Sequence, residues 1–216
     1  MNHQKRFREE IIIFTRYPQA GVTKTRLIPE LGADGAAAIH RSMSERIVRT
    51  AMRIVGEPGP RLTIYYTGGS HQLMRKWLGP ALSYHEQTGA DLGQKMMFAF
   101  RDAWQRGAKR AILIGTDCPS LDSGLITDAL ATLQNSLLVL GPATDGGYYL
   151  IGTTNGLPAD TLSGLFRNIA WGTSNVFQET VARAGKAGLT PSILTELHDI
   201  DHPGDLAYFH HHPDPQ

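Results

Sequence analysis

The feature that most restricts the fold of this sequence is its alternation of short apolar runs with amphipathic, helix-like segments. Residues 11–14, 111–114 and 137–140 are uninterrupted apolar runs. Such runs are typical of strands that helices cover on both faces. Between them, apolar residues recur at helical spacing, as in the series Ile39, Met43, Ile47 and Ala51. The pattern predicts an α/β domain with helices on both faces of a sheet.

The same pattern along the whole chain predicts the individual elements. Strands are expected at residues 11–16, 62–67, 82–85, 111–115, 137–140, 148–151 and 189–194. Helices are expected from Asp34 to 51, and at 71–77, 91–107, 125–133, 175–187 and 205–209. Since no repeat or linker divides the chain, residues 1–209 should form one domain and residues 210–216 a loose C-terminal tail.

The composition excludes several classes of protein. Lys and Arg number 21 against 20 Asp and Glu, a balance that offers no electrostatic surface for nucleic acid or an anionic membrane. No apolar run approaches the roughly 20 residues of a membrane-spanning helix. One cysteine cannot form a disulfide within the chain, which fits a reducing compartment. We therefore expect a cytoplasmic protein with no membrane span.

The loop after the first strand has the composition of a phosphate-binding loop. Open α/β sheets bind ligands beyond the carboxyl ends of their strands, so this loop is well placed. Gly21 would let the backbone approach a ligand, Lys24 would supply a point charge, and Arg26 could contact two oxygens at once. The loop is not a Walker A motif, because Thr23 stands where that motif has glycine. A solvated basic surface loop is the alternative interpretation.

Two aspartates follow later strands. Asp117 comes three residues after the end of the apolar run 111–114, where a carboxylate could hold Mg²⁺ or Mn²⁺ together with substrate phosphates. Alternatively, Asp117 could cap the helix that begins near Asp122. Asp145 precedes two glycines between two apolar segments. It could face the same cleft, or simply belong to a hairpin turn.

A further pair of carboxylates lies near the C-terminus. Asp199 and Asp201 flank Ile200, so an extended backbone would place both carboxylates on one face. Two adjacent carboxylates repel each other unless water or a cation lies between them. The pair therefore indicates either a second cation-binding position or a solvent-facing edge.

Several familiar active-site motifs are absent from the sequence. It contains no Gly-x-Ser-x-Gly, His-Glu-x-x-His, Cys-x-x-Cys or Gly-x-Gly-x-x-Gly. These absences disfavour a serine hydrolase, a zinc protease, a zinc ribbon and a dinucleotide-dependent oxidoreductase.

Taken together, the polar segments resemble the bacterial DUF2064 family. The resemblance rests on motifs in the family's order: Phe14-Thr-Arg16-Tyr-Pro18-x-x-Gly21-x-x-Lys24-Thr25-Arg26-Leu27, Gln87-x-Gly-x-Asp91-Leu92-Gly93, Ile114-Gly-Thr-Asp117-Cys-Pro119, Gly141-Pro-Ala-x-Asp145-Gly-Gly-Tyr-Tyr-Leu-Ile-Gly152 and Asp199-Ile-Asp201. Family members look like glycosyltransferases of the nucleotide-diphospho-sugar transferase superfamily, and some are labelled arsenosugar-biosynthesis glycosyltransferases. The resemblance implies a GT-A-like single domain with a mixed, mostly parallel sheet.

The resemblance also implies roles for individual residues. Nucleotide and phosphate contacts would come from Arg16, Gly21, Lys24, Thr25, Arg26 and Asp91. A divalent cation, Mg²⁺ or Mn²⁺, would be bound by Asp117 together with a second ligand, Asp199 or Asp201. Asp145 would be the catalytic residue near the transferred group. The chain departs from the family at His202 and Gly204, where Thr and Glu are usual, which leaves open how the second metal-binding segment is supported.

Three functions remain in competition. The first is metal-dependent transfer of a sugar from a nucleotide-diphospho-sugar to a small acceptor. The second is nucleotidyl transfer with release of pyrophosphate, because the Lys24–Leu27 segment also resembles that of phospholactate guanylyltransferases. The third is a non-catalytic nucleotide-binding domain, since a fold does not determine a function.

Overall fold

The structure, a computed structural model, describes residues 8–56 and 59–211. Its centre is a seven-stranded mixed sheet in the order β3-β2-β1-β4-β6-β5-β7. The strands are β1 (Glu9–Arg16), β2 (Arg61–Thr67), β3 (Ser83–Glu86), β4 (Arg110–Ile114), β5 (Leu138–Pro142), β6 (Tyr148–Thr154) and β7 (Ser192–Ile193). All neighbours pair in parallel except β6, which runs antiparallel to β4 and β5. The predicted α/β fold with a mostly parallel sheet is confirmed.

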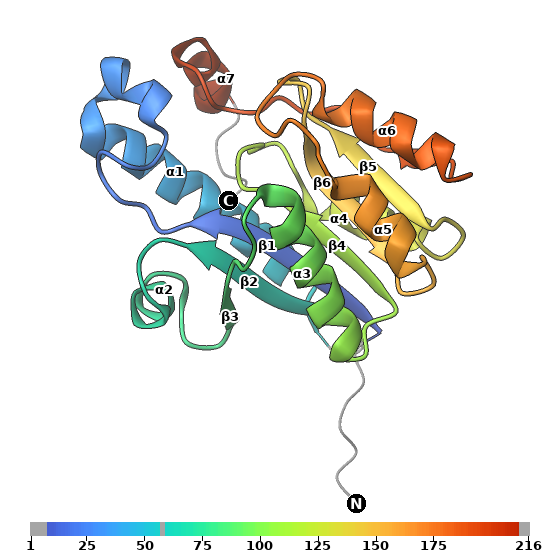
Figure 1. Cartoon of the computed structure of the whole chain (residues 1–216). Helices are drawn as coiled ribbons and strands as arrows, with labels where there is room; N and C mark the ends of the chain where they lie inside the picture. Colours follow the sequence, from blue (N-terminus) through green and yellow to red (C-terminus); the bar gives the residue numbers. More distant parts are fainter. Residues whose placement is uncertain (1–7, 57–58, 212–216) are drawn as a thin grey trace, which may run out of the picture.

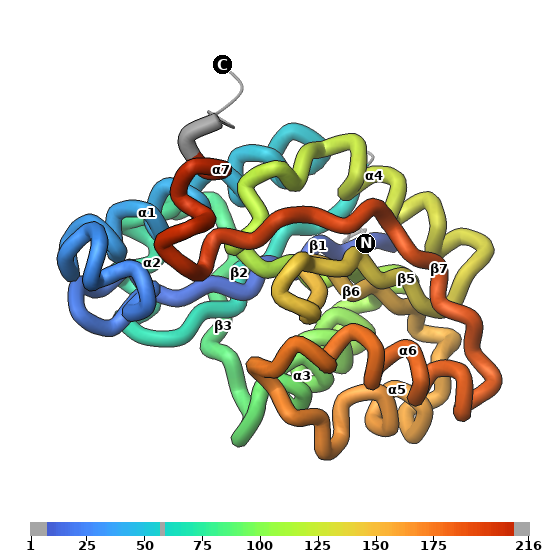
Figure 2. The backbone as a smooth tube through the Cα atoms, turned by 90° about the horizontal axis from the view of Figure 1, so that it is seen from above, coloured from blue at the N-terminus to red at the C-terminus, as the bar shows by residue number. Residues whose placement is uncertain are grey.

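Helices cover both faces of this sheet (Figures 1 and 2). The helices are α1 (Ile28–Met52), α2 (His71–Leu78), α3 (Leu92–Gln105), α4 (Ser123–Thr132), α5 (Ala159–Phe166), α6 (Val176–Lys186) and α7 (Leu206–His211). Helices α1, α2 and α4 pack on one face, and α3, α5 and α6 on the other. No helix of residues 8–56 and 59–211 is long and apolar enough to span a membrane.

The uninterrupted apolar run of β1 is explained by this two-sided cover. Successive side chains of a strand point to opposite faces. Ile11 and Ile13 therefore join the core beneath α1 and α4, while Ile12 and Phe14 join the core beneath α3 and α5. Both environments are dry, so the strand needs no polar face.

Several predicted boundaries are wrong. Helix α1 begins at Ile28, preceded by a 3-10 turn at Thr25–Leu27, so the predicted start at Asp34 matches only the part of α1 that follows its interruption. It is interrupted at Gly32, whose φ of 70° is not helical. Helix α5 was not expected, and the last predicted strand shrinks to Ser192–Ile193. Helix α7 extends to His211, and residues 212–216 of the predicted tail lie outside the described residues.

The segment after β7 brings the C-terminal part of the chain to the carboxyl ends of the parallel strands. Figure 2 shows it running across the sheet edge towards α7, which lies beside α1. Ala143 pairs with Leu197 in an isolated bridge, and the Ile200 N–H donates to the Asp117 carbonyl at 2.9 Å. The buried Ile200 side chain packs with Leu27 and Met43. This packing holds Asp199 and Asp201 next to the loops that follow β1 and β4.

Candidate active site

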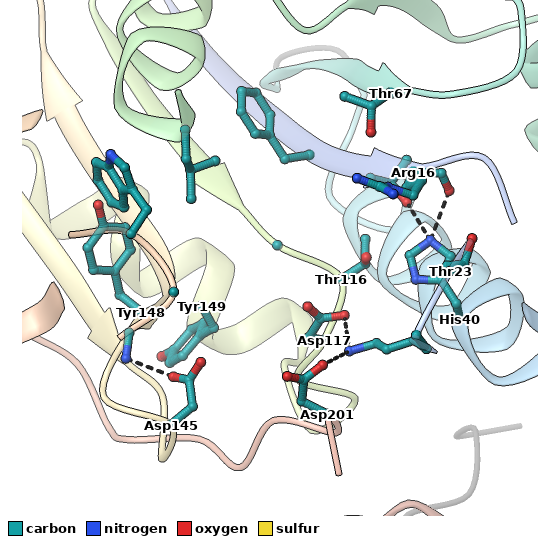
Figure 3. Close-up of a pocket in the computed structure, with 18 of the residues that line it drawn as sticks. Arg16, Thr23, His40, Thr67, Thr116, Asp117, Asp145, Tyr148, Tyr149 and Asp201 are labelled. Carbon is teal, nitrogen blue, oxygen red and sulfur yellow. Dashed lines mark hydrogen bonds and ion pairs between the residues drawn. The ribbon is translucent and has the colours of Figure 1, made fainter. Parts of the chain in front are cut away.

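A cavity of about 610 Å³ opens at the carboxyl ends of β1 and β4 (Figure 3). The chain leaves β1 for β2 and β3 and then returns to β4 on the other side of β1. Such a reversal of strand order separates the loops above the sheet and is the usual ligand crevice of open α/β folds. Because β6 is antiparallel, the loop before it, which carries Asp145, reaches the same edge.

Lys24 is the buried cation of this cavity. Its side chain is only 6% exposed, and its backbone adopts a left-handed conformation with φ of 50°. The ammonium contacts Asp117 Oδ1 at 2.8 Å, Asp201 Oδ1 at 3.4 Å and the Ile200 carbonyl at 2.6 Å. Burial alone would lower the pKa of Lys24, but Asp117 and Asp201 outweigh it and raise this pKa. The ammonium therefore stays charged.

The two carboxylates that contact Lys24 come from distant parts of the chain and converge on one point (Figure 3). Asp201 also forms an ion pair with Arg26. Loss of hydration would raise the pKa of Asp117, but the Lys24 ammonium overcomes it and lowers this pKa. Half of the Asp117 side chain, 52%, is nevertheless exposed, so the carboxylate can also contact a ligand.

Asp145 has the opposite electrostatic environment. Loss of hydration and repulsion from Asp199, Asp201 and Asp117 raise its pKa, although a hydrogen bond from the Gly147 N–H opposes the shift. A raised pKa makes this exposed carboxylate a stronger base than an ordinary aspartate. It is the one cavity carboxylate in the described chain with no cation in contact.

Asp199 supports the loop that carries Asp145. Its Oδ1 accepts hydrogen bonds from the Thr144 hydroxyl at 3.0 Å and the Asp145 N–H at 3.1 Å. Asp199 is buried and does not line the cavity. In the same segment, Asp205 accepts from the backbone N–H groups of Asp201 and His202. The departures at His202 and Gly204 thus leave the segment supported.

His40, in α1, supports the end of β1 through a hydrogen bond to its backbone. Its Nε2 lies 2.8 Å from the Arg16 carbonyl oxygen, which can only accept, so Nε2 carries the hydrogen. Burial lowers the pKa of His40 and keeps the ring neutral. Nothing in the sequence indicated this role, because a histidine on an apolar helix face has no recognisable spacing.

The remaining wall of the cavity is mixed in character. Near Asp145 it is mainly apolar and aromatic, with Met96, Tyr148, Trp171 and Val176. Near the ends of β2 and β3 it presents the polar side chains of Thr67 and Gln87. Thr67 and Asp145 lie toward opposite ends of the cavity, with Thr116 and Asp117 between them (Figure 3).

The cavity gathers most of the predicted site residues. Those that line it are Arg16, Lys24, Thr25, Arg26, Asp117, Asp145 and Asp201. Gly21, Asp91 and Asp199 do not. Asp91 caps α3 by accepting from the Gln94 N–H at 2.8 Å, so its predicted role in nucleotide binding stays a prediction. The alternative role of Asp117 as a helix cap is wrong, since Asp122 caps α4.

The fit of a divalent cation can be judged from the donor set. No cluster of three or more His, Cys, Asp or Glu side chains able to hold a metal occurs in residues 8–56 and 59–211. Asp117 and Asp201 nonetheless direct carboxylate oxygens at a single cation, the Lys24 ammonium. Mg²⁺ is usually bound by one or two carboxylates, waters and substrate phosphates. Two carboxylates beside the predicted phosphate-binding loop fit that requirement.

Solved structures of similar proteins share this architecture. A protein from Desulfovibrio desulfuricans G20, provisionally named a nucleotide-diphospho-sugar transferase, is 34% identical, with 90% of this chain and 83% of that chain covered and a TM-score of 0.83. The inositol-1-phosphate CTP transferase of T. maritima is 15% identical, with 93% and 91% covered and a TM-score of 0.55. At that identity the likeness concerns the fold alone.

The same fold occurs in a second solved structure of low sequence identity. The 4-diphosphocytidyl-2C-methyl-D-erythritol synthase of Anaerococcus prevotii DSM 20548 is 9% identical, with 93% of this chain and 94% of that chain covered and a TM-score of 0.57. The fold is therefore the GT-A-like fold that nucleotide-sugar transferases and nucleotidyltransferases share. A comparison with curated proteins gives no match.

The family model of DUF2064, described as an uncharacterized protein conserved in bacteria, matches residues 50–173. That span is more than half of the 216 residues. The chain belongs to the DUF2064 family.

Proposed function

We propose that this protein is a metal-dependent transferase that moves a sugar from a nucleotide-diphospho-sugar to a small acceptor. The observation that carries the proposal is the convergence of Lys24, Arg26, Asp117 and Asp201 at the carboxyl ends of β1 and β4. The two cations could bind phosphates and the two carboxylates could bind a metal. Asp145, a carboxylate with a raised pKa, lies beside them. The 34% identity to a protein provisionally named as such a transferase supports the same activity.

The cations suit the charge that this reaction develops. The bond between the anomeric carbon and the diphosphate oxygen breaks, and its electron pair leaves with the nucleoside diphosphate. The acceptor oxygen forms the new bond to the anomeric carbon. Lys24 and Arg26 would stabilise the leaving diphosphate more strongly than the intact donor, because the negative charge increases in the transition state.

Asp145 would accept the proton of the acceptor hydroxyl. We expect Asp145→Asn to lower kcat/KM by about 10²–10⁴-fold, since the amide cannot take a proton. The charged carboxylate is the active form, so wild-type activity should fall as the pH drops through the raised Asp145 pKa. The pH profile of kcat/KM should therefore fall off at a higher pH than an ordinary aspartate would produce. Asp145→Asn should lose this acidic limb.

Asp122→Asn provides the matched control for this prediction. It makes the same chemical change at a helix cap outside the cavity, where Asn also caps well. Wild-type turnover in Asp145→Asn, or an unchanged acidic limb, would remove Asp145 from the mechanism.

A divalent cation would be held by Asp117 and Asp201. When bound, it would supply positive charge to the diphosphate oxygens. We expect EDTA to abolish turnover and added Mn²⁺ to restore it. Thermal unfolding provides a second readout, because binding of a ligand raises the free energy of unfolding. At about 100 times its Kd a ligand adds about 2.7 kcal/mol, which is several degrees of Tm in a chain of this size.

The part of this thermal shift that depends on Mn²⁺ should disappear in Asp117→Asn and in Asp201→Asn. Asp128→Asn, on the exposed surface of α4, should keep it. Full Mn²⁺ dependence in both site variants would place the metal elsewhere.

Nucleotidyl transfer is the second candidate, favoured by the fold that the chain shares with the inositol-1-phosphate CTP transferase of T. maritima. The same cations and carboxylates would then stabilise pyrophosphate. Product analysis separates the two activities. A nucleoside diphosphate released from a diphospho-sugar supports glycosyl transfer, whereas pyrophosphate released from a nucleoside triphosphate supports nucleotidyl transfer. Binding of either donor without turnover, across a broad set of acceptors, would favour the non-catalytic alternative.

A further inference from the structure

The side-chain amide of Gln87 is held in one orientation. Gln87 directly follows β3, and its backbone N–H donates to the Tyr66 carbonyl at 2.9 Å. Its Nε2 donates to the carbonyl oxygens of Thr15 at 3.3 Å and Tyr65 at 3.2 Å. Because both partners can only accept, the amide nitrogen and not the oxygen must face them. The two strands β1 and β2 thus determine which end of the amide is free.

The free end is a hydrogen-bond acceptor. Gln87 lines the cavity, and in the described part of the chain its Oε1 has no hydrogen-bond partner. Thr67 lies at the corresponding end of β2 and adds a hydroxyl to the same wall. This end of the cavity therefore offers a ligand a fixed acceptor and a hydroxyl that can donate or accept.

The proposed function indicates which part of the donor reaches this end. The diphosphate belongs with Lys24 and Arg26, and the acceptor hydroxyl belongs with Asp145. Thr67 lies toward the end of the cavity opposite Asp145 (Figure 3). The part of the donor left for the Thr67 and Gln87 end is the nucleoside.

We infer that Gln87 determines which nucleobase the enzyme accepts, by receiving a hydrogen bond from a base N–H on its side-chain oxygen. The inference rests on the proposed function. Because carbonyls of β1 and β2 hold the amide nitrogen, the Gln87 side chain cannot flip and present a hydrogen-bond donor to the base instead. A base that presents an acceptor at that point therefore loses a hydrogen bond and meets a repelling oxygen. Gln87 is in this sense a specificity-determining residue, with no part in the chemical step.

The test is calorimetric titration in Mn²⁺ with UDP, CDP, GDP and ADP, and with inorganic pyrophosphate as a probe that has no base. In the wild type, the best base should bind at least about tenfold more tightly than the worst. Gln87→Lys keeps a donor for the Thr15 and Tyr65 carbonyls but removes the acceptor. Its added charge acts on all diphosphates alike, so the ratio between bases should fall to about two- or threefold.

Gln87→Leu should lower the ratio of affinities between the best and the worst base to the same about two- or threefold. It should leave the affinity for pyrophosphate within about twofold of the wild type. The matched control is Gln105→Leu, at the exposed end of α3 outside the cavity, which should keep the wild-type ratio. An unchanged ratio in both Gln87 variants overturns the inference, as does a wild type that does not discriminate between bases. If neither pyrophosphate nor any nucleoside diphosphate binds the wild type, the proposed function fails, and the inference fails with it.

Discussion

Replacing Lys24 by alanine is expected to lower kcat/KM by about 10²–10³-fold in a protein that remains folded. This is the usual cost of removing one group that stabilises developing negative charge in a shielded site. Lys24 meets that description, because its side chain is 6% exposed and its ammonium stays charged beside Asp117 and Asp201. The Asp117 side chain left behind is 52% exposed, so water can reach its carboxylate and the native fold should persist. Steady-state kinetics and circular dichroism measure the two effects.

Two further substitutions sharpen this prediction. Arg26 pairs with the same Asp201, but its side chain is 58% exposed, so Arg26→Ala should cost less than Lys24→Ala. Lys76→Ala, on the exposed surface of α2, should leave kcat/KM unchanged. Wild-type turnover in Lys24→Ala, or equal losses in Lys24→Ala and Lys76→Ala, would remove Lys24 from the phosphate site.

The order of strands and helices could be predicted because burial on both faces leaves a clear sequence pattern. The run 11–14 is apolar at every position since its side chains enter two different cores. The start of the first helix could not be predicted in this way. Residues 28–33 include Pro29 and Gly32, which are typical of loops, and their Ile28 and Leu31 pack with Ile200, some 170 residues away. A tertiary contact of this kind leaves no local pattern.

The sequence predicts which residues line the site better than it predicts which of them contact one another. Lys24, Asp117 and Asp145 were expected at one edge, because each lies in a loop at the carboxyl ends of the parallel strands, and they do line one cavity. The ion pair between Lys24 and Asp117 was not expected, since nothing local relates the two loops. The sequence pattern does not distinguish Asp199 from Asp201, yet Asp199 supports the Asp145 loop and Asp201 contacts Lys24.

Gly146→Ala is expected to destabilise the protein and to distort the cavity. Gly146 has φ of 86°, where an alanine is strained by about 1–2 kcal/mol. An added Cβ would lie 2.6 Å from the Ser174 Cα and closer still to its carbonyl, a clash with backbone that no side-chain rotation relieves. Overpacking of this kind costs about 1–3 kcal/mol more. The combined loss of about 2–5 kcal/mol corresponds to a Tm decrease of roughly 4–20 °C.

The same substitution should lower activity, because Gly146 joins two walls of the cavity. Its carbonyl accepts a hydrogen bond from the Phe177 N–H at 2.9 Å. The contact ties the Asp145 loop to the segment that carries Trp171 and Val176. Gly164→Ala is the matched control: nothing lies within 4 Å of its added Cβ, and inside α5 alanine should be neutral or stabilising by up to about 1 kcal/mol. If both variants unfolded at the wild-type Tm, the close approach of the Asp145 loop to Ser174 would not exist in solution.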